Sequence, residues 1–136
     1  MAKIVVGYDA SDSARAALAA AVELAGPLGD EVHVVVAYEV HRGGGEVADF
    51  AAALAERAQT LVKLARDQAA GLHAQIETEA VEAPRADALV DVAERLAARM
   101  IVVGTRGESP LRGALVGSTP HKLLQISERP VLIVPG

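Results

Sequence analysis

The sequence predicts a single α/β domain, residues 1–136, in which an open parallel sheet carries helices on both faces. Short runs rich in valine and isoleucine alternate with longer runs rich in alanine and leucine, a pattern typical of strands joined by helical crossovers. The valines stand next to one another, which indicates strands buried on both faces. Aromatic residues make up only 2% of the chain, so aliphatic side chains must fill the core.

Nine elements are expected, with strands and helices alternating from the first to the last. The strands are expected at residues 3–8, 31–38, 73–80, 100–104 and 131–134. The helices are expected at residues 12–25, 46–70, 86–98 and 118–126. Ser11 has the side chain of a helix N-cap, and the Gly26-Pro27 pair is expected to end the first helix. The glycine-rich segment 41–45 is interpreted as a loop.

The charge balance and the absent residue types argue against several classes of function. The net charge of −5 disfavours a nucleic-acid partner, because phosphate backbones are bound by basic surfaces. The chain has no cysteine, and its four histidines lack the spacing of zinc ligands, so no metal site is expected. No apolar run approaches the ~20 residues of a membrane helix, and no signal-peptide pattern opens the chain. We therefore expect a cytoplasmic protein without a membrane partner.

The segment after the fourth expected strand combines features that favour an anion site. Gly104 has no Cβ atom, so backbone there can approach a ligand closely. Gly117, Ser118 and Thr119 stand where a helix begins, and free amides and hydroxyls at such a place bind phosphate. Arg106 adds forked donors for phosphate oxygens. Taken alone, the same residues also fit an ordinary glycine turn followed by a helix cap.

Asp9 directly follows the first expected strand. Ligands of open parallel sheets bind at the carboxyl ends of strands, near the point where the strand order reverses. This rule favours a ligand contact for Asp9. A cap for the helix that follows is also a sufficient reason for an acidic residue at this position.

The glycine spacing resembles that of a known family. Gly104-x2-Gly107-x9-Gly117-Ser118 is similar to the G-x2-G-x9-G-[S/T] motif of ATP-binding universal stress proteins. Residues 5–11 and 129–135 resemble the opening and closing strands of that family. The resemblance covers essentially the whole chain. It implies a Rossmann-like fold of the adenine nucleotide alpha hydrolase type, with five strands in the order 3-2-1-4-5.

The resemblance also implies roles for individual residues and an assembly. Asp9 would face the adenine or the ribose, and the backbone of Ala37 or Tyr38 would meet the adenine edge. The remaining nucleotide contacts would come from Val103, Gly104, Gly107, Gly117, Ser118 and Thr119, with the last three holding the phosphates. A homodimer would form through the last strand, Val131, Leu132, Ile133 and Val134.

We therefore expect an ATP-binding regulatory homodimer of the stress-response type, with ATP as ligand and Mg²⁺ as its companion ion. No residue is assigned a catalytic role, because the chain has neither a G-x-x-x-x-G-K-[S/T] phosphate loop nor a G-x-S-x-G nucleophile elbow. Two alternatives stay open. One is a slow ATPase or phosphoryl-transfer enzyme, in which Mg²⁺ with Asp9 or Asp12 organises the γ-phosphate. The other is a structural dimerisation module without a ligand, paired through its last strand.

Overall fold

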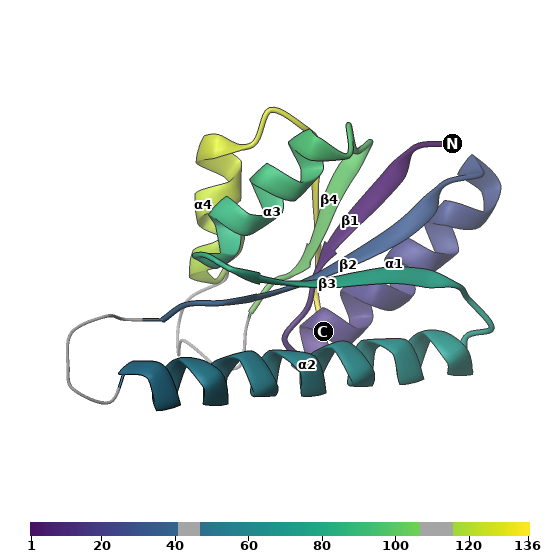
Figure 1. Ribbon diagram of the computed structural model, residues 1–136. Coiled ribbons are helices and arrows are strands. Elements are labelled where there is room, and N and C mark those ends of the chain that lie inside the picture. The colour runs from purple at the N-terminus through teal and green to yellow at the C-terminus, as the bar shows by residue number, and fades with distance from the viewer. Residues whose placement is uncertain (41–46, 107–115) are drawn as a thin grey trace.

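The computed structural model describes residues 1–40, 47–106 and 116–136, and these form one parallel sheet with helices on both faces (Figure 1). The strands are β1 (Lys3–Gly7), β2 (Glu31–Tyr38), β3 (Ile76–Glu82), β4 (Met100–Gly104) and β5 (Val131–Val134). The helices are α1 (Asp12–Leu28), α2 (Val47–Gly71), α3 (Arg85–Arg95) and α4 (Ser118–Ile126). The strand order is β3-β2-β1-β4-β5, so the predicted fold class and strand order are confirmed. The expected loop at 41–45 and the site residue Gly107 lie outside the described residues.

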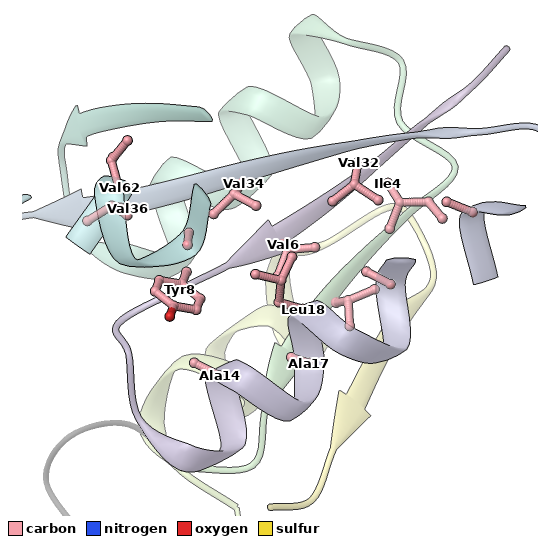
Figure 2. Packing of buried hydrophobic residues seen from close by; sticks show 14 of the residues in the cluster. Ile4, Val6, Tyr8, Ala14, Ala17, Leu18, Val32, Val34, Val36 and Val62 are labelled. Atoms are coloured by element: carbon pink, nitrogen blue, oxygen red, sulfur yellow. The ribbon is translucent and has the colours of Figure 1, made fainter. Parts of the chain in front are cut away.

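The consecutive valines are explained by the two cores that the sheet separates. Helices α1 and α2 cover one face, and α3 and α4 cover the other (Figure 1). Val6 of β1 belongs to the first core, whereas its neighbour Val5 belongs to the second, and both side chains are fully buried. Figure 2 shows Val6 in the first core together with Ala17 and Leu18 of α1. A strand that packs against helices on both sides needs apolar residues at every position, not at every second one.

Helix α1 does not end at the predicted Gly26-Pro27 pair. It continues through Pro27 to Leu28 and closes on Gly29, whose φ of 69° lies in the left-handed region. The amides of Gly29 and Asp30 bond back to the carbonyl oxygens of Gly26 and Ala25, which is the usual closure of a helix on glycine. Proline removes one backbone donor, and the last turn tolerates this loss because glycine supplies the actual stop.

Two other boundaries are shifted by left-handed residues. The strand predicted at 73–80 is β3 at 76–82, because the end of α2 uses the preceding residues in a turn where His73 has a φ of 56°. The helix predicted at 86–98 is α3 at 85–95, because Ala97 with a φ of 50° turns the chain toward β4. The Ser11 cap is confirmed, since its hydroxyl accepts the Ala14 amide at 3.2 Å. In the described ranges, no helix has the length and apolar character needed to cross a membrane.

Candidate functional site

A cavity of about 290 Å³ lies at the carboxyl ends of β1, β2 and β4. Parallel strands place these ends at the same edge, so segments far apart in the sequence meet there. Eight of the ten residues predicted for the site line this cavity: Asp9, Ala37, Val103, Gly104, Arg106, Gly117, Ser118 and Thr119. Tyr38 lines a second cavity of about 310 Å³, between the end of β2 and helix α2. Gly107 falls in the stretch that the structure leaves undescribed.

One end of the cavity is the N-terminus of α4. The Gly117 amide bonds to the Thr105 carbonyl oxygen at 2.6 Å, which joins the chain before and after the undescribed stretch. A helix begins with four amides that have no partner within it. In α4 the first is used by Thr105 and the fourth position is Pro120, which has no N–H. The amides of Ser118 and Thr119 are left, and within the described part of the chain no side chain caps them.

The other end contains Asp9, held by the turn between β1 and α1. Its Oδ1 atom accepts hydrogen bonds from the Ser11 amide at 3.0 Å and the Ser11 hydroxyl at 2.5 Å. Its Oδ2 atom faces Arg85 Nη1 at 3.3 Å. Ala10, between Asp9 and Ser11, has a φ of 64°, a conformation rare for a residue with a Cβ. This backbone is fixed by bonds on both sides, so the carboxylate has a defined direction toward the cavity.

The wall between the two ends is largely apolar, with side chains of Val35, Leu89 and Val103. Tyr8 also lines it and is almost completely buried. Burial raises the pKa of the Tyr8 hydroxyl, Arg15 opposes this and Asp9 adds to it. Tyr8 therefore stays neutral at physiological pH, and among the described lining residues the charged side chains are those of Asp9, Arg85 and Arg106. Such a cavity suits a ligand with an anionic tail, a flat apolar body and a polar far edge.

The family model described as the universal stress protein family matches residues 1–135. The chain belongs to the universal stress protein family. A universal stress protein of Methanocaldococcus jannaschii is 30% identical over an alignment of 137 positions, which covers 97% of this chain and 81% of that protein.

Solved universal stress proteins share the fold of this member. One, solved in complex with cAMP, is 30% identical with a TM-score of 0.72 and covers 98% of this chain and 95% of its own. Another, from Archaeoglobus fulgidus in complex with dAMP, is 25% identical with a TM-score of 0.65 and covers 98% of both chains. The likeness extends over almost the whole chain.

In this universal stress protein, position 104 must be glycine for a structural reason that the sequence did not reveal. The prediction was that its missing Cβ lets a ligand approach. A Cβ at this position would collide with the Ser13 hydroxyl and lie 2.6 Å from the Ser13 carbonyl carbon. Real Cβ atoms do not come this close to backbone, so Gly104 is required by the packing of α1 against β4.

Sequence reasoning did not assign Arg85, which lines the cavity, or Ser13, which bonds to the backbone of the lining residue Arg106. Ser13 is buried, and its hydroxyl donates to the Arg106 carbonyl oxygen and accepts from the Arg106 amide at 3.3 Å. It thereby fixes the point where the chain leaves β4. A small polar residue in the first turn of a helix gives little signal for such a role. Arg85 had a signal, because a cation is unusual at the first position of a helix.

Proposed function

We propose that this protein binds an adenine nucleotide, ATP with Mg²⁺, in the cavity at the ends of β1, β2 and β4. The observation that carries the proposal is the set of amides and hydroxyls of Ser118 and Thr119 at one end of the cavity, where no described residue caps the start of α4. A helix N-terminus attracts anions through its partial positive charge and its unpaired donors. The complexes of relatives with cAMP and dAMP support an adenine nucleotide as the class of ligand.

The proposed orientation puts the phosphates at α4 and the base at the other end. Arg106 stands beside the phosphate end and would contribute a further cation. The flat base would lie against Val35, Leu89 and Val103, with Asp9 and the backbone of Ala37 at its polar edge. A volume near 300 Å³ is at the small end of the range for ligand pockets, which fits a mononucleotide.

The proposed role is a nucleotide-dependent regulatory homodimer of the cytoplasmic stress response. The described lining of the cavity contains Asp9 but no histidine, lysine or cysteine, so binding is better supported than fast turnover. Strand β5 pairs with β4 alone in the described sheet, and Leu132 on it is 37% exposed. An apolar edge strand favours pairing with a second copy.

The direct test is calorimetric titration of the purified protein with ATP and Mg²⁺, after analysis of any nucleotide that co-purifies. Gly117→Val should abolish binding. A Cβ on Gly117 would lie 3.1 Å from the Thr105 carbonyl oxygen, so a branched side chain must displace the amides that follow. Gly26→Ala is the matched control, since nothing lies within 4 Å of a Cβ there. No uptake of ATP by the wild type, or full affinity in Gly117→Val, would refute the proposal.

A further inference from the structure

Arg85 occupies an electrostatically unfavourable place. It is the first residue of α3, where the partial positive charge of a helix N-terminus disfavours a cation. Pro84 before it provides no side-chain cap, and the acidic residue of the first turn is Asp87. A cation at this position therefore does not serve the helix, and its reason must lie in what the guanidinium contacts.

The guanidinium lies at the base end of the cavity. The Ala83 amide bonds to the Tyr38 carbonyl oxygen at 2.9 Å, which brings the start of α3 beside the end of β2. Helix α4 follows β4, and β1 stands between β2 and β4 in the sheet. Arg85 and Ala37 also line the second cavity on the β2 side. Arg85 is therefore on the side of the cavity away from the amides of Ser118.

The Arg85 guanidinium has N–H donors that no described residue uses. Among the described residues its hydrogen bond is the one from Nη1 to Asp9 Oδ2 at 3.3 Å, and a guanidinium carries five N–H groups. Its side chain is 46% exposed, whereas that of Asp9 is 11% exposed. Asp9 Oδ1 is committed to Ser11. The cavity thus presents an acceptor, Asp9 Oδ2, directly beside a donor, the Arg85 guanidinium.

We propose that Arg85 is a specificity-determining residue that donates a hydrogen bond to a ring nitrogen of the base. The neighbouring 6-amino group donates a hydrogen bond to Asp9. This inference rests on the proposed function. Adenine presents a donor, its 6-amino group, next to an acceptor, N1 on one side or N7 on the other. An acceptor and a donor held side by side match that edge. The ligand class is therefore a 6-aminopurine nucleotide.

A purely structural role would give Arg85 the same ion pair. It would then hold α3 to the turn between β1 and α1, and its loss would weaken every ligand equally. The two roles separate in the dependence on the ring nitrogen. The experiment is a calorimetric comparison of ATP, 1-deaza-ATP and 7-deaza-ATP, which lack N1 and N7 respectively, on the wild type and on Arg85→Met.

We expect the wild type to bind one of the two analogues about tenfold more weakly than ATP, as one charge-assisted hydrogen bond in a half-exposed site predicts. Arg85→Met should bind ATP about tenfold more weakly and lose the discrimination. Arg85→Lys, which keeps a donor, should retain part of it. Arg95→Met is the matched control, because Arg95 also lies on α3 and pairs with a carboxylate, Glu79, but does not line the cavity.

An equal loss for all three nucleotides in Arg85→Met, or no discrimination in the wild type, would overturn the role of Arg85 and leave nucleotide binding standing. A wild type that binds none of the three would overturn the proposed function and this inference together. Arg85→Lys that behaves as Arg85→Met in affinity and in discrimination would contradict a donor role.

Discussion

The two ends of the cavity are built in different ways. At the α4 end the donors are backbone amides of Ser118 and Thr119, which exist because a helix starts there. At the other end the polar atoms belong to side chains, Asp9 and Arg85, which are 76 residues apart and come from two elements. Backbone donors recognise a charge and not a particular ligand. Paired side chains recognise a pattern of donors and acceptors, so we infer that affinity comes from the first end and selectivity from the second.

The largest expected effect tests whether Gly104, at the end of β4, is required for packing. Gly104→Ala should destabilise the fold by about 3 kcal/mol, because the new methyl group meets the backbone of Ser13 and neither segment can move freely. This corresponds to a fall of about 10 °C in the thermal midpoint. Calorimetry or circular dichroism of the ligand-free protein measures it.

The same measurement on Gly26→Ala provides the contrast. That glycine lies in α1 with open space around it, so alanine should stabilise the helix by up to about 1 kcal/mol. If Gly104→Ala were as stable as the wild type but bound nucleotide poorly, Gly104 would belong to the ligand site, as the sequence first indicated.

A change of intermediate size separates backbone from side chain at the α4 end. Ser118→Pro removes one of the two free amides at the first helical position, where proline is well tolerated. Gly117 before it is extended, with a ψ of 176°, as a residue before proline requires. We expect affinity for ATP to fall about tenfold, equivalent to about 1.4 kcal/mol, and affinity for adenosine to stay unchanged.

Ser118→Ala is the control for that variant, since it loses the hydroxyl but keeps the amide. It should weaken ATP binding less than Ser118→Pro. The reverse order would mean that side chains, and not the backbone, make the anion site, and the contrast between the two ends would fail.

The smallest expected effect concerns an ion pair at the opposite edge of the sheet. Asp30 and Arg99 precede β2 and β4, with Arg99 Nε 2.5 Å from Asp30 Oδ2. The hydrogen bond from Arg99 holds the pKa of Asp30 below its ordinary value, although burial acts in the other direction. A lowered folded-state pKa gives stability that is present above the unfolded-state pKa and lost as the pH falls through the folded one.

Asp30→Asn should therefore have a slightly lower thermal midpoint than the wild type at neutral pH, and the gap should close in acid. Its affinity for ATP at neutral pH should equal that of the wild type, because neither residue lines the cavity. A gap that widened on acidification would contradict the assigned direction of the shift.

The α/β class and the alternation of elements could be predicted from the sequence, and eight of the ten predicted site residues line the cavity. The first two follow from local patterns of valine and alanine, and the cavity residues also from the resemblance to a family. The predicted end of α1 was wrong because proline in a last turn costs little stability once Gly29 closes the helix. The predicted start of β3 was wrong because the alternation of polar and apolar residues at 73–80 does not reveal the left-handed turn at His73.

Ser13 and Arg85 were missed for the same physical reason. The pairing of Ser13 with Arg106 and that of Arg85 with Asp9 join segments 93 and 76 residues apart. Neither pairing leaves a periodic trace in either segment. Such contacts depend on how α1 and α3 sit against the sheet, which the pattern of apolar residues determines only approximately.

The close packing of α1 against the end of β4 also affects how the sequences of related chains can diverge. A descendant that had lost its ligand would still have to keep glycine at position 104, since any larger residue would force strand and helix apart. Positions 85 and 118, which do not hold the layers together, would be free to drift. Glycine would then be retained at position 104 because of packing, even in chains that had lost both the ligand and the arginine at position 85.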